Sequence, residues 1–375
     1  MGKGFGIVSD LNLGEMLLAG YARHCTDMTP ATNGHPPPEK ATATAAAAAP
    51  TAAATRLPRL RIAAITNDTV ATYASLAYSS NSRVAMGLVV GTGTNATVPM
   101  PVASLAAFKT APLDLLPRGP GGSSPDVVIV NTEWSVVGTD EPLRALGVPT
   151  PWDAALSAAC ESPGFQPVEY MTAGRYLGEL VRLVLVQLLL PPEEGGREEE
   201  LPPRLLEKNA VSTRFLATAV ALAEDDDALK RSLDELYPPP PPPPPSAAGG
   251  AFAWTAQRVG LLRAVAEAVQ VRSAALVAAM IVGLLARVGE VQLDGEAGGD
   301  DGAAEEVDKE ELVVAHTGGV ILQYPGYLEI CEKWIDTLIS KGSRRNAGKR
   351  VVLSEAKDGG VIGAAVLAGM FAEVR

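Results

Sequence analysis

Two segments, Ile65-Thr66-Asn67-Asp68-Thr69-Val70 and Gly91-Thr92-Gly93-Thr94-Asn95-Ala96, decide how this chain is interpreted. The apolar run Leu60–Thr66 has the length of a strand and leads to the carboxylate of Asp68. The glycine-rich segment follows a second apolar run, Arg83–Val90, and such turns let backbone N–H groups approach a phosphate. A carboxylate and a phosphate-binding turn at the ends of neighbouring strands predict phosphoryl transfer to a hydroxyl group.

Each feature also has a plain structural interpretation. Asp68 directly precedes the helical pattern Thr69–Tyr78, and Asp is a preferred helix N-cap. Many strands end in glycine turns without binding a phosphate. Taken singly, neither feature establishes a site.

Strand-like and helix-like segments alternate along the chain. Further strands are predicted at Asp126–Asn131, buried on both faces, and at Leu312–Val314 and Arg350–Leu353. Helices are predicted over Asp10–His24, Glu169–Leu190, Asn209–Leu236, Ala256–Arg287, Tyr327–Ser340 and Gly363–Val374. This alternation predicts an α/β fold.

Polar side chains gather at the ends of several predicted elements. They are the amides of Asn67 and Asn95 and the carboxylates of Asp68, Glu133 and Glu169. Each hydroxyl of a sugar both donates and accepts hydrogen bonds, and amide and carboxylate groups from separate elements are suited to bind it. The set as a whole therefore indicates a polyol site.

The bulk composition of this 375-residue chain excludes several classes of function. The net charge of −12 comes largely from residues 294–311, which hold nine acidic residues and one lysine, and no basic patch indicates nucleic acid. Three Cys and three His show no metal-ligand spacing, so no metal site is predicted. The uncharged run Ser273–Ala286 is too short to span a bilayer, and the N-terminus has no signal core. We therefore expect a cytoplasmic protein without a membrane partner.

Low-complexity segments interrupt the periodic ones. Residues 28–55 are rich in Ala, Thr and Pro, and further loops are expected near 193–203, 238–250 and 294–311. Eight consecutive prolines, Pro238–Pro245, fit either a ligand of SH3 or WW domains or a plain surface insertion.

The chain resembles the hexokinase family from about Lys3 to Ala365, with its motifs in matching order. Besides the two opening segments, the resemblance rests on Lys3-Gly4-Phe5, Asn131-Thr132-Glu133-Trp134, Pro163-Gly164-Phe165-Gln166 with Glu169, Gly174–Arg182, Ser212–Leu216 and Val271–Ala275. It implies the actin-like ATPase fold, related to ribonuclease H, in which two α/β lobes close on a hexose.

The resemblance also implies roles for particular residues. Asp68 would be the general base that deprotonates the 6-hydroxyl of the hexose. Lys3, Asn67, Asn95, Glu133 and Glu169 would hold the other sugar hydroxyls. The nucleotide, ATP with Mg²⁺, would bind at Thr92, Gly93, Gly174, Thr213, Gly318 and Gly360. The implied reaction is the first step of hexose metabolism.

This chain departs from the family pattern in the smaller lobe. The family's Asp-Leu-Gly-Gly-Thr and Ser-Phe-Pro segments have no counterpart, and its Asp-Gly-Ser and Gly-Ser-Gly motifs stand here as Thr317-Gly318-Gly319 and Gly359-Gly360-Val361. We expect a small-lobe remnant over 1–66, a large domain over 67–362 and a small-lobe helix over 363–375. Val366, Leu367, Met370 and Phe371 of that helix would lack partner surface, which predicts self-association. A non-catalytic sugar-binding or regulatory protein, or a truncated gene model of an active kinase, remain alternatives.

Overall fold

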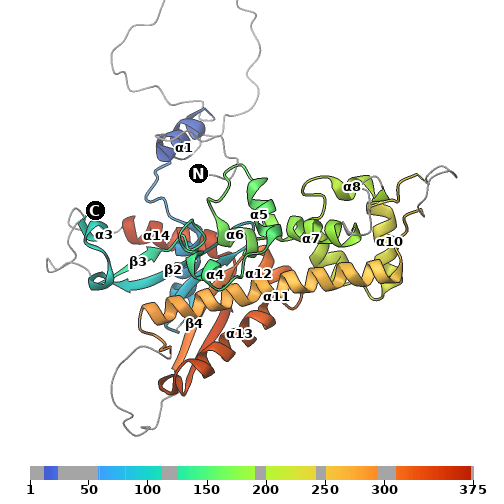
Figure 1. Cartoon of the computed structure of the whole chain (residues 1–375). Coiled ribbons are helices and arrows are strands. Elements are labelled where there is room, and N and C mark those ends of the chain that lie inside the picture. The colour runs from blue at the N-terminus through green and yellow to red at the C-terminus, as the bar shows by residue number, and fades with distance from the viewer. Residues whose placement is uncertain are drawn as a thin grey trace, which may run out of the picture.

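A five-stranded mixed sheet organises the chain. The computed structural model describes residues 12–23, 58, 60–80, 82–111, 126–190, 200–241, 251–293 and 310–372. The strands are β1 (Val84–Val90), β2 (Thr94–Pro101), β3 (Val127–Asn131), β4 (Glu310–Thr317) and β5 (Lys349–Glu355), in the spatial order β3-β2-β1-β4-β5. Helices cover both faces of this sheet (Figure 1).

The pairing of the strands sets the position of the glycine turn. β1 and β2 form an antiparallel hairpin in which Val90 pairs with Thr94, so Gly91–Gly93 is its tip. β2 pairs antiparallel with β3, whereas β4 and β5 run parallel to β1. The carboxyl ends of β1 and β4 therefore meet at the same edge of the sheet, beside the start of β2.

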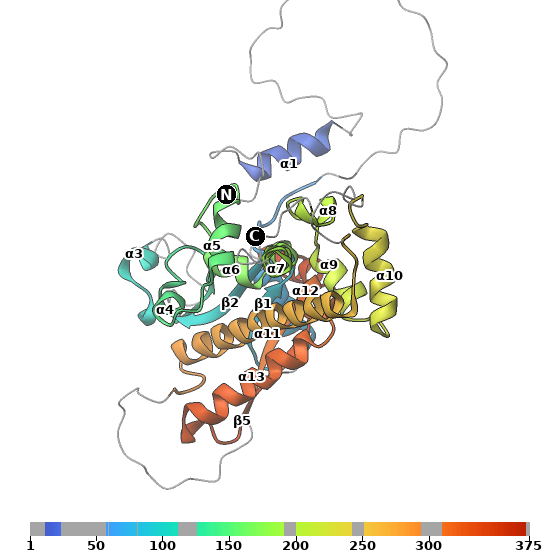
Figure 2. The ribbon, with the colours of Figure 1, turned by 45° about the vertical axis from the view of Figure 1, so that its right-hand side comes forward.

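One face of the sheet packs against the main helical layer. Met86, Leu88 and Val314 point into a large apolar core that includes α7 (Gly174–Leu189), α11 (Ala256–Arg287) and α13 (Tyr327–Gly342). α11 and α13 run across the front of the sheet in Figure 2. The fully buried Leu177, Leu180 and Ile281 show that this layer supplies most of the apolar burial.

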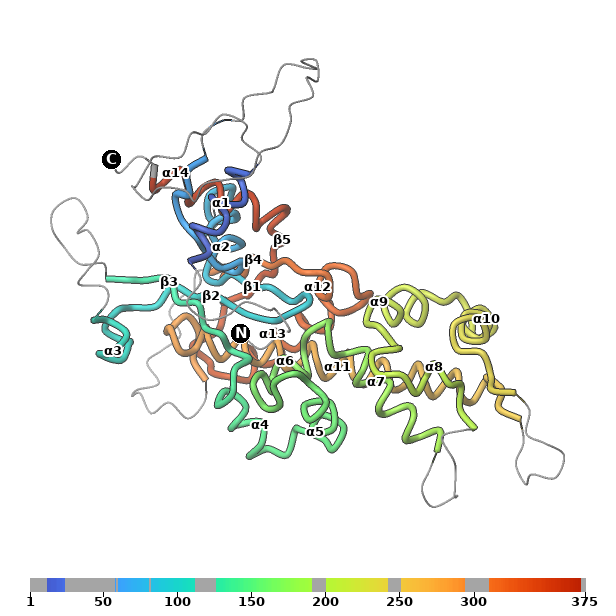
Figure 3. The backbone as a smooth tube through the Cα atoms, turned by 90° about the horizontal axis from the view of Figure 1, so that it is seen from above, coloured from blue at the N-terminus to red at the C-terminus, as the bar shows by residue number. Residues whose placement is uncertain are grey.

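The opposite face carries α2 (Asp68–Ser79) and α14 (Gly359–Ala372), which lie together in Figure 3. These elements approach one another through glycines. A Cβ atom at Gly87 would lie 2.5 Å from the carbonyl oxygen of Thr69, and one at Gly363 would lie 1.8 Å from that of Ala71. α2 is thus held between the sheet and α14 at backbone contact distance.

The remaining elements frame these layers. α8 to α10 lie at the far end of α7 and α11 (Figure 3). The bounds are α1 (Leu13–Ala22), η1 (Val102–Ser104), α3 (Ala107–Thr110), α4 (Glu141–Ala145), α5 (Pro151–Ala158), α6 (Pro167–Thr172), α8 (Pro203–Leu206), α9 (Thr213–Phe215), the π-helical η5 (Leu216–Val220), α10 (Asp226–Leu236), α12 (Gly319–Gln323) and η6 (Arg344–Asn346).

The predicted strand at Leu60–Thr66 is wrong. Residues 60–67 form no strand, and Leu60 and Ile65 are exposed. A strand needs a neighbouring backbone to pair with, and this segment pairs with none of the five strands. Asp68 is therefore the first residue of helix α2 and does not end a strand.

Four other predictions need correction. β3 is an edge strand with Val127 and Ile129 exposed, so it is not buried on both faces. The helix predicted over Glu169–Leu190 is broken at Ala173, between α6 and α7, and Asn209–Leu236 divides into α9, η5 and α10. The terminal helix begins at Gly359, earlier than expected. Residues 28–55 and most residues of the loops predicted near 193–203, 238–250 and 294–311 lie outside the described residues.

Helix α11 is the one helix, within the described part of the chain, that is long and apolar enough to cross a membrane. Of its most apolar window, 56% is buried inside the fold, and the core helix of a globular protein has the same composition.

Candidate active site

The N-terminus of α2 places Asn67 and Asp68 beside the sheet. Asn67 is the N-cap, and its Oδ1 accepts hydrogen bonds from the backbone N–H of Thr69 at 2.8 Å and from the Thr69 hydroxyl at 2.6 Å. The Thr69 hydroxyl also lies 2.5 Å from that of Thr97 on β2, and both threonines are fully buried. This contact attaches the first turn of α2 to β2. The carboxylate of Asp68 stays exposed at the same end of the helix.

A second group of polar side chains joins β2 to the end of β3. Asn95 donates from Nδ2 to Oδ1 of Asn131 at 2.7 Å and to Oε1 of Glu133 at 3.3 Å. Asn131 in turn donates to the same Glu133 oxygen at 2.9 Å. Glu133 is exposed and its Oε1 accepts from both amides, which leaves Oε2 as an acceptor for a ligand.

The backbone of Glu133 is strained. Its φ angle is +45°, in the left-handed region that residues other than glycine rarely adopt. Such strain is characteristic of functional sites, because the surrounding structure must hold it in place.

Glu169 differs from the other candidates in being almost completely buried. It lies on α6 with 1% of its surface exposed, and the hydroxyl of the equally buried Ser135 donates to its Oε2 at 3.3 Å. Glu133 and Ser135 lie on the same turn, which therefore links the exposed carboxylate to the buried one.

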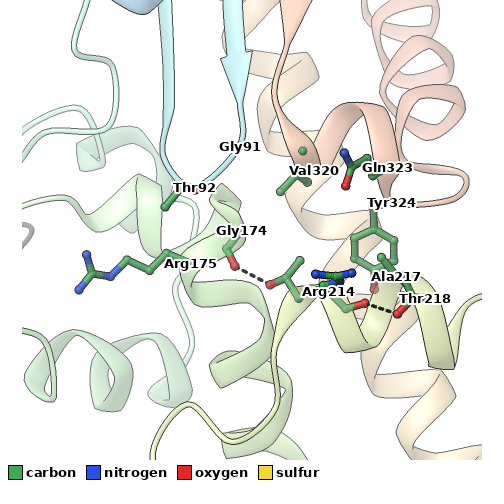
Figure 4. Close-up of a pocket in the computed structure, with 12 residues that line it drawn as sticks. Gly91, Thr92, Gly174, Arg175, Arg214, Ala217, Thr218, Val320, Gln323 and Tyr324 are labelled. Carbon is green, nitrogen blue, oxygen red and sulfur yellow. Dashed lines mark hydrogen bonds between the residues drawn. The ribbon is translucent and has the colours of Figure 1, made fainter. Parts of the chain in front are cut away.

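A pocket of about 520 Å³ opens at the β1–β2 turn (Figure 4). Such a volume suits a small-molecule site. Its lining residues are Gly91, Thr92, Gly174, Arg175, Thr213, Arg214, Ala217, Thr218, Gly319, Val320, Gln323 and Tyr324.

Close backbone contacts form the floor of this pocket. The N–H of Gly174 donates to the carbonyl oxygen of Gly91 at 2.8 Å. Gly318 has a φ angle of +117°, and a Cβ atom there would lie 2.4 Å from the carbonyl oxygen of Val90. Only glycine fits at this position. The backbones of Gly91, Gly174 and Gly318 thus lie in contact at the β1–β2 turn.

The hydroxyl of Thr213 has a structural role. It donates to the carbonyl oxygen of Gly174 at 2.6 Å and accepts from the N–H of Gly178 at 3.1 Å. Thr213 therefore connects α9 to the first turn of α7.

Two arginines give the pocket a positive charge. Arg175 pairs with Glu161 at 3.0 Å. Arg214 has no carboxylate within ion-pairing distance among the residues that the structure describes. Burial raises the pKa of Tyr324 to about 12, so its phenol stays neutral at the pocket wall. An arginine without a carboxylate partner, next to converging backbone N–H groups, suits an anionic phosphate group.

The structure brings together part of the predicted nucleotide site. Thr92, Gly174 and Thr213 line the pocket, and Gly318 packs against Gly91, which also lines it. Gly93 belongs to the same turn but does not line the pocket, although its carbonyl oxygen accepts from the N–H of Gly91. Gly360 lies at the start of α14 and lines no part of this pocket. Lys3 lies outside the described residues.

Sequence reasoning did not select Asn131, Thr97, Ser135, Arg175 or Arg214. Arg175 and Arg214 directly follow Gly174 and Thr213 in the sequence, and this position next to a predicted nucleotide contact could have identified them. Asn131, Thr97 and Ser135 are recognisable only through the partners that the fold gives them. Among the described residues, no group of three or more His, Cys, Asp or Glu side chains could hold a metal ion.

Comparison with known proteins gives one consistent result. A family profile described as hexokinase matches residues 85–370. Hexokinase-1 of Oryza sativa subsp. japonica is 29% identical over 311 residues, covering 82% of this chain and 53% of that protein. The hexokinase of Schistosoma mansoni is 36% identical over 157 residues, covering 42% of this chain and 31% of that protein. The chain thus spans about half the length of the curated relatives it matches most fully.

Solved structures agree. A structure of the Schistosoma mansoni hexokinase complexed with glucose matches with a TM-score of 0.58 and 28% identity, covering 82% of this chain and 57% of that one. Another hexokinase structure matches with a TM-score of 0.57 and 25% identity, covering 82% of this chain and 55% of that one. The predicted α/β fold of the actin-like ATPase type is confirmed.

Proposed function

This chain belongs to the hexokinase family, and we propose that it carries the large-lobe part of a site that transfers a phosphoryl group from ATP to the 6-hydroxyl of a hexose. One observation carries the proposal: a single hairpin turn separates the two halves of the site. Asn95 lies just after the turn, in the amide and carboxylate cluster, while Gly91 and Thr92 of the turn itself line the pocket.

The sugar side would work by positioning and by proton transfer. Asp68 is exposed and is the first residue of α2, next to the N-cap Asn67. It would accept the proton of the attacking hydroxyl, a contribution that typically amounts to about 10²–10⁴-fold in rate. Asn67, Asn95, Glu133 and Glu169 would orient the sugar so that this hydroxyl faces the turn.

The nucleotide side would bind phosphate groups through the turn and the arginines. The N–H groups near Thr92 and the guanidinium of Arg214 would neutralise negative charge, while Tyr324 and Val320 would supply apolar wall. ATP with Mg²⁺ supplies the phosphoryl group and further charge neutralisation when bound. The family's Asp-Gly-Ser motif is Thr317-Gly318-Gly319 here, so this chain offers one carboxylate fewer to the nucleotide, and its one hydroxyl stands at the first position instead of the third.

A coupled assay with ATP and glucose tests the proposal. Wild type should turn over, and Asp68→Ala should lower kcat by about 10²–10⁴-fold. Asp227→Ala is a matched control, because Asp227 is an exposed carboxylate in the first turn of α10. It should leave turnover unchanged.

The outcomes separate the alternatives. Equal turnover in wild type and Asp68→Ala would remove Asp68 from the mechanism. Binding of glucose by calorimetry without turnover would establish a non-catalytic sugar-binding protein. Absence of both would refute the proposal.

A further inference from the structure

The orientation of the Asn67 amide follows from its hydrogen bonds. Its Oδ1 accepts from the N–H of Thr69, a group that can only donate, and also from the Thr69 hydroxyl. Both acceptor positions of Oδ1 are therefore used within the first turn of α2. The NH₂ group points away from the helix, and it has no acceptor among the described residues.

The direction of the next hydrogen bond follows from counting protons. The Thr69 hydroxyl has one proton, which it donates to Asn67 at 2.6 Å. In the 2.5 Å contact between Thr69 and Thr97, Thr97 must therefore be the donor. The hydrogen bonds are therefore all donated in one direction: Thr97 donates to Thr69, and Thr69 donates to Asn67.

This chain of hydrogen bonds is shielded from water. Thr69 and Thr97 are each 0% exposed, so no solvent molecule competes for either hydroxyl. Linked hydrogen bonds in a low-dielectric interior strengthen one another. Thr97 also pairs with Asn131 across β2 and β3, which places it beside the second polar cluster.

We propose that Thr97 is a positioning residue whose hydroxyl acts through Thr69 to hold Asn67, so that Asn67 meets the hexose as a hydrogen-bond donor. This inference rests on the proposed function. Asn67 would then recognise a lone pair of a sugar oxygen, while Asp68 beside it accepts a proton. The two neighbouring side chains have opposite hydrogen-bonding roles, which restricts how a sugar can lie between them.

The competing interpretation is that Asn67 is only a helix cap. Asn67→Ser separates the two, because Ser is an equally good N-cap that adds no charge and lacks the outward NH₂ group. If the donor role is right, the affinity for glucose in calorimetry should fall about tenfold, with an unchanged midpoint of urea unfolding. A purely capping role predicts wild-type affinity.

Thr97 is tested by a pair of variants. Thr97→Val keeps the shape but removes the hydroxyl, and the affinity for glucose should fall about three- to tenfold. Thr97→Ser restores the donor and should bind as wild type does. The affinity for a non-hydrolysable ATP analogue should be the same in all variants, and Ser75→Ala, which removes another buried hydroxyl from the α2 layer, should change neither affinity.

The results distinguish the two levels of the proposal. If wild type binds glucose and Asn67→Ser and Thr97→Val bind equally well, the positioning role is wrong and the proposed function stands. If Thr97→Ser is as weak as Thr97→Val, the hydroxyl is not the cause and the inference fails. Absence of glucose binding by wild type would overturn both.

Discussion

The two faces of the central sheet are built in different ways. The face toward α7, α11 and α13 is covered by a continuous core of large apolar side chains. The face toward α2 has a small core of Val84, Val313, Ala315 and Ala356, and its helices approach at glycines. Most of the buried apolar side chains therefore lie on the first face, whereas Asn67, Asp68 and Thr69 lie on the second.

This difference explains where strain and polarity can be tolerated. The large apolar core offsets the free-energy cost of burying the Glu169 carboxylate and of holding the Glu133 backbone in the left-handed region. The α2 face instead requires short backbone distances, so its tolerance of added volume is small.

The contacts at Gly363 offer the strongest way to break the α2 face. Gly363→Val should lower the free energy of unfolding by about 3 kcal/mol or more, because even its Cβ would lie 1.8 Å from the carbonyl oxygen of Ala71. Urea denaturation measures the loss. Gly369→Ala in the same helix meets no atom within 4 Å and should be neutral or slightly stabilising. Equal behaviour of the two variants would show that α14 does not pack as described.

Acid should destabilise the protein through His316, which lies on the face of the sheet toward α7, α11 and α13. Strand alternation points His316 to the same side as Leu312 and Val314, and it is 2% exposed. Burial lowers its pKa from 6.5 to about 4, so the folded protein keeps it neutral while the unfolded chain takes up a proton. The free energy of unfolding should therefore fall by up to about 3 kcal/mol as the pH drops from 6.5 to 4, and no further below that.

Urea unfolding at a series of pH values measures this contribution. His316→Leu should remove it while leaving the carboxylate contributions in place. An unchanged pH profile in His316→Leu would contradict the assignment.

A pair of adjacent valines compares the two faces within one strand. Val314→Ala removes two methyl groups from the large core and should cost about 2–3 kcal/mol, whereas Val313→Ala on the α2 face should cost about 1–2 kcal/mol. Urea denaturation measures the loss of unfolding free energy in each variant, and the ratio of the two losses compares the packing of the two faces. A larger loss for Val313→Ala would show that the α2 face is the more tightly packed one.

Glu133 offers a test of strain at the site. Glu133→Gly should be more stable than Glu133→Ala by about 1 kcal/mol, because glycine adopts a φ angle of +45° without steric cost. Both variants should lose affinity for glucose in calorimetry. Equal stability of the two would show that the backbone relaxes.

The smallest effect on stability is expected at the end of α14. Met370 and Phe371 are 62% and 54% exposed, which supports the proposal that this helix promotes self-association. Replacing both by Ser should change the free energy of unfolding by less than about 0.5 kcal/mol. It should nevertheless lower the average mass measured by light scattering, and an unchanged mass would exclude this helix as the contact.

Long periodic segments were predictable from the sequence. α11 spans Ala256–Arg287 as predicted, because its apolar residues recur over many turns and leave no alternative register. The division into domains stays a prediction. Short apolar runs were less predictable: Leu60–Thr66 and Asp126–Asn131 read alike, yet only the second finds a strand to pair with.

The sequence by itself determined the family, the order of the motifs and most of the candidate polar residues, since these depend on residue types at fixed spacing. The tertiary structure decided that Asp68 begins a helix, that Thr92, Gly174 and Thr213 share one pocket, and that Gly360 lies apart from it. It also decided that Thr97 contacts Thr69, the partner of Asn67, and that Asn131 contacts Asn95. Hydrogen bonds between residues about 30 positions apart depend on how strands and helices pack, and no local pattern specifies them. The first turn of α2 thus lies against β2 only because the fold brings Thr69 and Thr97 together.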